Sequence, residues 1–155
     1  MREQTCCFTG HREIPEYHDK QLRLELKTTA VKLIERGIRF FGAGGALGFD
    51  TLAAQTVLAL KPAYPHIRLI LVLPCPDQDL YWSPSQRRDY REVCKCADKV
   101  VYVSTAYDRT CMYRRNRHLV DCSSVCVAYC TREWGGTAYT VRYAERKGLE
   151  LIFLP

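Results

Sequence analysis

The chain of 155 residues is 47% hydrophobic and carries a formal net charge of +6. This size and composition predict one domain over residues 1–155 whose core needs no disulfide, and the positive charge suits an anionic partner, either a nucleotide or a nucleic acid. The longest wholly apolar run, Leu69–Leu73, is far too short to cross a bilayer, and no signal peptide is recognisable before the first cysteines, so we expect a cytoplasmic protein without a membrane partner.

The first half of the chain alternates short apolar segments with longer segments that repeat apolar residues at helical spacing. Leu22, Leu26 and Ala30 lie four residues apart, and Gly37 is a suitable end for that helix. The apolar run before Pro74 suits a strand that is buried on both faces. We predict, in chain order, a strand over Gln4–Phe8, a helix over Tyr17–Arg36, a strand over Ile38–Gly42, a helix over Asp50–Leu60 and a strand over Ile67–Leu73.

The second half continues this alternation after an extended loop that begins with Pro74 and Pro76. Strands that alternate with helices are typical of the α/β class. They predict a single Rossmann-like domain with a mainly parallel sheet of about six strands and helices on both faces. The remaining elements are expected as a helix over Ser83–Cys96, a strand over Val100–Val103, a helix over Thr110–Val120, a strand over Val125–Tyr129, a helix over Gly136–Lys147 and a strand over Leu151–Leu154.

A glycine-rich stretch, Gly42–Gly48, lies between the second strand and the second helix. Such a turn lets backbone amides and the positive end of a helix converge on an anion, usually a phosphate. The stretch matches neither the G-x-G-x-x-G pattern nor a P-loop, since no lysine follows Gly48. A phosphate site and a tight turn without a ligand therefore both stay open.

Two further loops have the same position relative to a strand. Thr9-Gly10-His11-Arg12 follows the first strand, and Gly135-Gly136-Thr137 lies between the fifth strand and the last helix. Parallel strands end at one edge of their sheet, so all three loops should lie at the edge where open α/β sheets bind ligands. The alternative for the first loop is a turn whose histidine and arginine are only solvated.

The arginines and cysteines indicate a function less specifically than the glycine-containing loops do. The basic stretch Arg109–His118 predicts either an anion clamp or an exposed helix face. The nine cysteines are expected to be reduced thiols, since no export signal accompanies them. Neither the pair in Cys94–Cys96 nor the three cysteines in Cys122–Cys130 has the paired spacing of a zinc site, and we expect no metal and no cofactor.

Four motifs occur in one order along nearly the whole chain: Phe8-Thr9-Gly10-His11-Arg12, Gly44-x-x-Leu47-Gly48-x-Asp50, Tyr113-x-Arg115-Asn116-x-x-x-Val120-Asp121 and Gly135-Gly136-Thr137-Ala138-Tyr139-Thr140-Val141. Together they resemble the YpsA-like branch of the SLOG superfamily. That superfamily also contains the DNA-processing protein DprA and the cytokinin-activating LOG proteins.

The resemblance implies a nucleotide or nucleotide-derived ligand above the glycine turns, with the protein acting as a binding module or sensor. Glycine amides would donate to phosphate, and aspartates would accept from ribose hydroxyls. A homo-oligomer is left open. The implied ligand-binding residues are Gly10, His11 and Arg12 on one side, Gly44, Gly45, Gly48 and Asp50 on the phosphate side, and Asn116, Asp121, Gly135, Gly136 and Thr137 on the other side.

The chain departs from the LOG pattern at one chemically important position. LOG proteins have a Gly-Gly-x-Gly-Thr-x-x-Glu run whose carboxylate assists glycosidic cleavage, and Thr140 occupies the position of that glutamate here. A threonine cannot hold negative charge beside an oxocarbenium ion. In addition, Ser123-Ser124 replaces the Ser-Asp that is common in this branch.

Three functions therefore remain, and whether the protein is an enzyme is left open. The leading one is nucleotide binding without chemistry. The first alternative is hydrolysis of a nucleotide N-glycosidic bond, with Asp50 or Asp121 as the candidate catalytic carboxylate. The second alternative is DprA-like binding of single-stranded DNA, which the basic stretch and the aromatic residues Trp82, Tyr107 and Tyr113 would favour.

Overall fold

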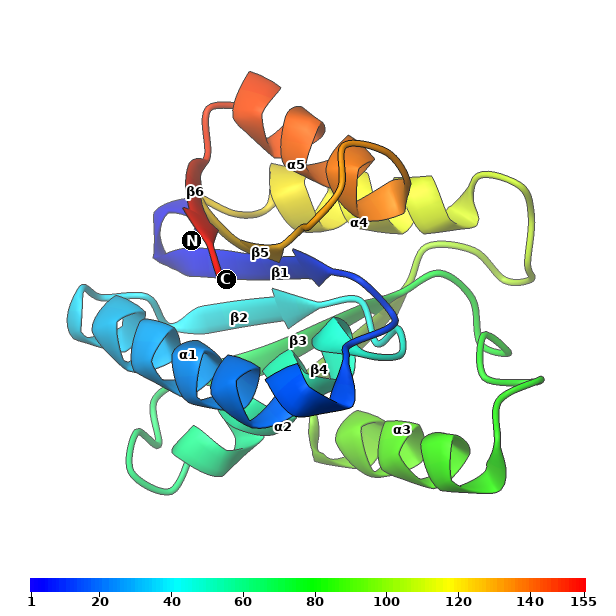
Figure 1. Cartoon of the computed structure of the whole chain (residues 1–155), viewed down its shortest axis with the longest axis horizontal. Helices are drawn as coiled ribbons and strands as arrows, with labels where there is room; N and C mark the ends of the chain where they lie inside the picture. Colours follow the sequence, from blue (N-terminus) through cyan, green and yellow to red (C-terminus); the bar gives the residue numbers. More distant parts are fainter.

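The computed structural model describes residues 1–155 and has six strands and five α-helices (Figure 1). A short 3-10 turn over Arg2–Gln4 precedes them. The elements are β1 (Thr5–Gly10), α1 (Glu16–Glu35), β2 (Phe40–Ala43), α2 (Phe49–Leu60), β3 (Arg68–Leu73), α3 (Pro84–Cys96), β4 (Lys99–Tyr102), α4 (Cys111–Asp121), β5 (Val125–Tyr129), α5 (Gly136–Arg146) and β6 (Glu150–Phe153).

All six strands form one sheet in the order β4-β3-β2-β1-β5-β6, and every neighbouring pair is parallel. From β1 the chain adds strands toward β4, then crosses back to place β5 on the other side of β1. The predicted Rossmann-like parallel sheet is therefore confirmed. The reversal opens a crevice at the carboxyl ends of β1 and β5, which is where such sheets bind ligands.

Two strand boundaries differ from the prediction by two residues, and the other strand boundaries agree to within one residue. Strand β1 runs to Gly10 instead of Phe8, because its pairing with β5 continues as far as Gly10 opposite Tyr129. Strand β2 begins at Phe40 instead of Ile38, because the amide of Ile38 still donates to the carbonyl of Leu33 at 3.0 Å in the turn after α1. The first difference thus depends on pairing with a neighbouring strand, and the second on the turn that ends α1.

The helices cover both faces of the sheet, as predicted. Helices α1, α2 and α3 lie on one face, and α4 and α5 lie on the other (Figure 1). The larger buried cluster joins Leu26 of α1, Phe49 of α2 and Tyr90 of α3 to the strands. The smaller cluster, on the opposite face, contains Leu119 of α4 and Ala144 of α5. None of the helices is long and apolar enough to cross a membrane.

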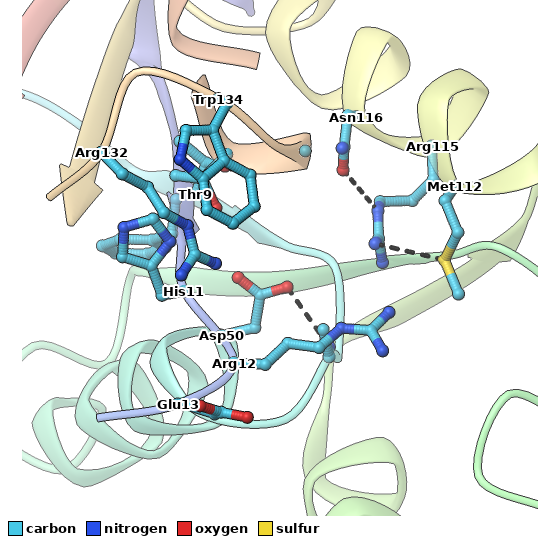
Figure 2. Close-up of a pocket in the computed structure, with 15 residues that line it drawn as sticks. Thr9, His11, Arg12, Glu13, Asp50, Met112, Arg115, Asn116, Arg132 and Trp134 are labelled. Atoms are coloured by element: carbon cyan, nitrogen blue, oxygen red, sulfur yellow. Dashed lines mark hydrogen bonds between the residues drawn. The ribbon is translucent and has the colours of Figure 1, made fainter. Parts of the chain in front are cut away.

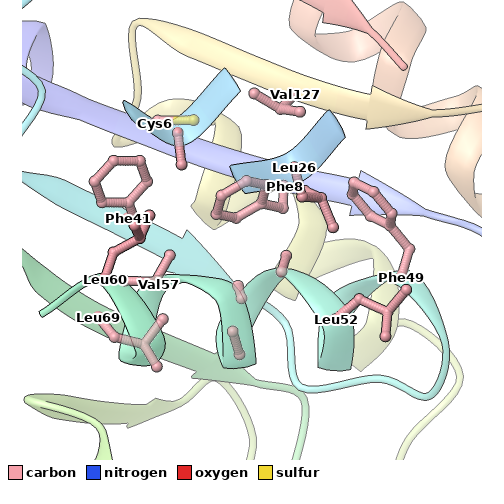
Figure 3. Packing of buried hydrophobic residues seen from close by; sticks show 14 of the residues in the cluster. Cys6, Phe8, Leu26, Phe41, Phe49, Leu52, Val57, Leu60, Leu69 and Val127 are labelled. Atoms are coloured by element: carbon pink, nitrogen blue, oxygen red, sulfur yellow. The ribbon is translucent and has the colours of Figure 1, made fainter. Parts of the chain in front are cut away.

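Aromatic packing in the larger cluster fixes the start of α2 against the central strand (Figure 3). The Phe8 ring stacks on Phe41 with centroids 6.0 Å apart and meets the edge of Phe49 at 6.3 Å. Burying one such side chain stabilises the fold by roughly 1.5–3 kcal/mol. Because Phe49 is the first residue of α2, this packing also fixes the turn that precedes it.

Candidate functional site

A cavity of about 340 Å³ lies at the carboxyl edge of the sheet, above the ends of β1 and β5 (Figure 2). This volume lies within the range of ligand pockets. The cavity is lined by the loop after β1, the turn before α2, the first half of α4, and the loop after β5 with the start of α5. The fold therefore brings together segments from all four sequence motifs, and Gly10, His11, Arg12, Asp50, Asn116, Gly136 and Thr137 of the predicted set line the cavity.

The loop after β1 places His11 in the cavity wall. Its Nε2 accepts a hydrogen bond from the amide of Thr131 at 2.8 Å, and its ring meets Tyr129 edge-on at 5.5 Å. Burial and the nearby Arg132 guanidinium lower the pKa of His11. The ring is therefore neutral at pH 7, and because Nε2 accepts, Nδ1 carries the proton.

The glycine turn before α2 is used largely for internal packing. The amide of Phe49 donates to the carbonyl of His11 at 3.1 Å, and the amide of Ala46 donates to Oδ2 of Asp50 at 3.2 Å. Gly48 has φ of 77°, and a Cβ there would overlap the carbonyl of Arg12. The N-terminal end of α2 is thus closed by the β1–α1 loop.

The three glycines assigned to the phosphate side lie behind the cavity wall instead of lining the cavity. A Cβ on Gly45 would lie 2.6 Å from Leu73, and one on Gly44 would lie 2.5 Å from Nη1 of Arg115. Gly44, Gly45 and Gly48 therefore allow close packing around the turn. Gly10 has the same role, since a Cβ there would overlap the ring of Phe49.

Asp50 and Arg115 are buried charged residues in the cavity wall, with exposed fractions of 7% and 5%. Arg115 donates from Nη1 to the carbonyl of Gly44 at 2.5 Å and from Nε to Oδ1 of Asn116 at 2.7 Å. Burial raises the pKa of Asp50, opposed by Arg115 and the amide of Ala46. Burial likewise lowers the pKa of Arg115, opposed by Asp50.

At the start of α5 the first amide is free as well, whereas at the start of α2 the amide of Phe49 donates to His11. Gly135 has φ of 98°, and the amides of Gly136, Thr137 and Ala138 donate to no acceptor in the protein. A Cβ added to Gly136 would meet nothing within 4 Å. Free amides at a helix N-terminus, facing a cavity, form the arrangement that binds an anion.

Sequence reasoning misses two residues of the loop between β5 and α5. The Arg132 guanidinium lies over the Trp134 ring, 4.5 Å from its centroid, and both residues line the cavity. The Trp134 side chain is 68% exposed. Their position between a predicted strand end and a predicted glycine turn was the available signal. The other lining residues outside the predicted set are Phe8, Thr9, Glu13, Ala46, Met112 and Arg115.

Two residues that the sequence associates with catalysis lie away from the cavity. Asp121 is at the opposite end of α4 from Met112 and accepts a hydrogen bond from the Tyr143 hydroxyl at 2.7 Å. The structure does not bring it near Asp50. Thr140 is buried, and its hydroxyl donates to the carbonyl of Gly136 at 2.8 Å. Asp50 and Glu13 are thus the carboxylates that line the cavity.

Side chains that bind metals are not grouped at the cavity. The nine cysteines are free, and no group of three or more histidine, cysteine or carboxylate side chains is placed to hold a metal ion. The donors that converge on the cavity are amides, guanidinium groups and one imidazole, which suit an anion.

Known proteins are similar to this chain in sequence or in fold. The uncharacterised SPbeta prophage-derived protein YoqJ of Bacillus subtilis is 31% identical over 140 residues, which cover 81% of this chain and 82% of YoqJ. A UPF0398 protein of Halalkalibacterium halodurans is 30% identical over 118 residues, which cover 74% of this chain and 62% of that protein. DNA processing protein A of Helicobacter pylori superposes with a TM-score of 0.71 at 20% identity, over 99% of this chain and 66% of that one.

The family assignment rests on most of the chain. The family model for YpsA, described as the YspA SLOG family, matches residues 6–150, from the start of β1 to the start of β6. The matched region contains the four motifs and all the segments that line the cavity. The chain therefore belongs to the YpsA family of SLOG proteins.

Proposed function

We propose that the protein binds a nucleotide or nucleotide-derived ligand through a phosphate at the start of α5. The single observation that supports this is the set of three free amides at the start of α5, of Gly136, Thr137 and Ala138; Gly136 and Thr137 line the cavity. A phosphate there would receive backbone hydrogen bonds and the favourable field of the helix dipole. Arg12 and Arg132 line the same cavity and supply charge-assisted contacts.

The cavity offers more than an anion site. The exposed ring of Trp134 stands beside the start of α5 and presents an aromatic face on which a base can stack. The buried carboxylate of Asp50 adds a hydrogen-bond acceptor at the opposite wall. Amides, an aromatic face and a carboxylate match the phosphate, base and sugar of a nucleotide. A protein that binds a nucleotide in this way can act as a sensor without catalysing a reaction.

Calorimetric titration with nucleoside mono- and diphosphates tests this function. Gly136→Pro removes one of the free amides at the first helical position, where proline is well tolerated, and should weaken binding about 10-fold. Gly136→Ala is the matched control, because it keeps the amide and its Cβ meets open space. A folded wild-type protein that binds no nucleotide would refute the proposal.

Single-stranded nucleic acid is a second candidate ligand for the same surface. The observation in its favour is the Arg132–Trp134 pair, since single strands stack bases on aromatic rings beside basic groups. The Helicobacter pylori structure is described by its single-stranded DNA binding mode. A mobility shift with an oligothymidine strand should weaken steeply with salt; no shift at low salt would exclude this function.

Hydrolysis of a nucleotide N-glycosidic bond is a third candidate, favoured by one observation. Asp50 is a buried carboxylate in the cavity wall, with a raised pKa. A carboxyl group of this kind is a candidate general acid or general base. Chromatography after incubation with nucleoside monophosphates would reveal free base. Release by Asp121→Asn but not by Asp50→Asn would support hydrolysis, whereas equal release from both variants, or none from the wild type, would exclude it.

A further inference from the structure

The surface at the start of α3 gathers three arginines. An open depression of about 400 Å³ is lined there by Trp82, Pro84, Arg87, Arg88 and Arg91. It shares no lining residue with the nucleotide cavity at the start of α5. Like charges within one helical turn repel one another, so an anion has to lie near these arginines.

Asp79 supplies this anion to two of the three arginines. It is 6% exposed, and its Oδ2 lies 3.4 Å from Nε of Arg87 and 3.5 Å from Nε of Arg91. The terminal nitrogens of these two guanidinium groups donate no hydrogen bond to the protein. Those nitrogens form the fork with which arginine holds an anionic oxygen pair. Asp79 therefore orients Arg87 and Arg91 and leaves their binding ends free.

The charges in the depression do not balance. The third arginine, Arg88, is exposed and forms no ion pair. Three guanidinium groups beside the one carboxylate of Asp79 leave an excess of two positive charges. The depression therefore suits an anionic partner.

Exposed apolar side chains stand next to the arginines. Leu80 is 50% exposed and Tyr81 is 94% exposed. The amide of Trp82 donates to the carbonyl of Asp79 at 3.1 Å, which closes a turn with Leu80 and Tyr81 at its tip. The Trp82 ring packs edge-on against Tyr90 with centroids 5.1 Å apart and anchors this turn to α3. Aromatic residues and arginine are the residue types that protein interfaces favour.

The surrounding carboxylates favour a short acidic segment over a nucleic acid strand. Asp89 and Glu92 lie on α3 among the arginines, and both are exposed. Asp89 also lines a neighbouring depression with Glu13 and Arg12 of the loop after β1. A phosphate backbone that continued from α3 to Arg12 would pass these carboxylates and be repelled by them. A short segment needs only the arginine depression.

We propose that this surface docks an acidic peptide segment of a partner protein. The segment's carboxylates would pair with the free ends of the guanidinium groups, and an apolar side chain of the segment would pack on the exposed tip of the turn. Figure 1 shows α3 and the loop before it on the side of the sheet opposite α4 and α5. The docking surface consists of Leu80, Tyr81, Trp82, Arg87, Arg88 and Arg91.

Fluorescence anisotropy with a labelled peptide of glutamates and aspartates around one leucine tests this proposal. The wild type should bind the peptide, and added salt should weaken the binding. A matched peptide of glutamines and asparagines should not bind. Arg88→Glu reverses a charge without touching the contacts of Asp79, and it should weaken binding about 10-fold. Tyr81→Ser should also weaken binding, by several-fold.

Arg142→Glu is the matched control, because it makes the same charge change on α5, across the sheet from α3. It should keep nearly the wild-type affinity. Equal losses in Arg142→Glu and Arg88→Glu would show attraction to the net charge alone and overturn the proposal. Absence of peptide binding at low salt, or equal binding of the uncharged peptide, would also overturn it.

A nucleic acid arm completes the experiment. An oligothymidine strand that binds more tightly than the acidic peptide, and that Arg88→Glu weakens, would assign the surface to nucleic acid and overturn the peptide proposal. The anisotropy measurements contain no nucleotide. Their outcome is therefore independent of the function proposed for the cavity.

Discussion

His11 and Thr131 are 120 residues apart in the sequence, yet the ring nitrogen Nε2 of His11 accepts the Thr131 amide at 2.8 Å. This hydrogen bond joins the loop after β1 to the loop after β5. These are the two loops that diverge where the strand order reverses. The width of the cavity therefore depends on a histidine that must stay neutral.

Protonation of His11 should destabilise the fold. Its pKa in the folded protein lies below the ordinary value of 6.5, so the unfolded chain takes up the proton first as pH falls. The stability due to neutral His11 is complete above about pH 6.5 and is lost as pH drops toward the lower folded pKa. Urea unfolding at a series of pH values should show a flatter profile for His11→Gln. His66→Gln, in the exposed turn before β3, should retain the wild-type slope; identical slopes for all three proteins would contradict this.

Two glycines of the predicted site should respond oppositely to alanine. In Gly44→Ala the new Cβ would lie 2.5 Å from Nη1 of Arg115 and 2.9 Å from Oδ2 of Asp50, so we expect a loss of about 1–3 kcal/mol of unfolding free energy. Gly136→Ala has open space and begins a helix, so its stability should match or exceed the wild type by a few tenths of a kcal/mol. Urea denaturation measures both. Equal losses would show that the turn before α2 is less tightly packed than the structure indicates.

Sequence patterns predict the elements well because each depends on local spacing. The four-residue repeat through Leu22 and Leu26 lies within α1, and the apolar run before Pro74 is β3. Loop position is equally predictable in a parallel sheet. The loop that follows Gly10 and the loop that ends at Gly135 do meet at one edge, because strands β1 and β5 are neighbours.

Sequence patterns do not show which acceptor each backbone amide uses. The two glycine turns look alike along the chain, yet the amide of Phe49 is taken by His11 while that of Gly136 is free. Asp121 shares a motif with Asn116, but the length of α4 separates it from the cavity. A motif therefore indicates which segments meet, and tertiary packing decides which atoms remain available.

Trp134 should contribute to binding more than its exposed position suggests. If a base stacks on its ring, Trp134→Ala should weaken nucleotide binding by about 1–3 kcal/mol, or roughly 5- to 150-fold. Tyr81→Ala provides the control, since Tyr81 is 94% exposed on the loop before α3 and lies outside the cavity. Calorimetric titration of the three proteins with one nucleotide gives the comparison. Undiminished affinity in Trp134→Ala would assign the base to another part of the cavity.

Asp50 and Arg115 should behave as a coupled pair in unfolding experiments. Burial disfavours the charge on each, and each opposes that penalty for the other. Asp50→Asn alone leaves a buried guanidinium without its nearest carboxylate, and Arg115→Met alone leaves a buried carboxylate. The losses of unfolding free energy in the two single variants should therefore sum to more than the loss in the double variant. The difference, which is the coupling energy, should be about 1–3 kcal/mol.

A double-mutant cycle in urea at neutral pH measures this coupling. Because Asp50 and Arg115 both border Gly44, the cycle also reports how firmly the charged pair holds the turn before α2. Asp98 and Lys61 form a partly exposed pair at 2.6 Å and offer a reference cycle, which should give a smaller coupling because water screens it. If the effects of the Asp50 and Arg115 changes add to within about 0.3–0.5 kcal/mol, the two charges act independently, and Arg115 supports Gly44 without neutralising Asp50.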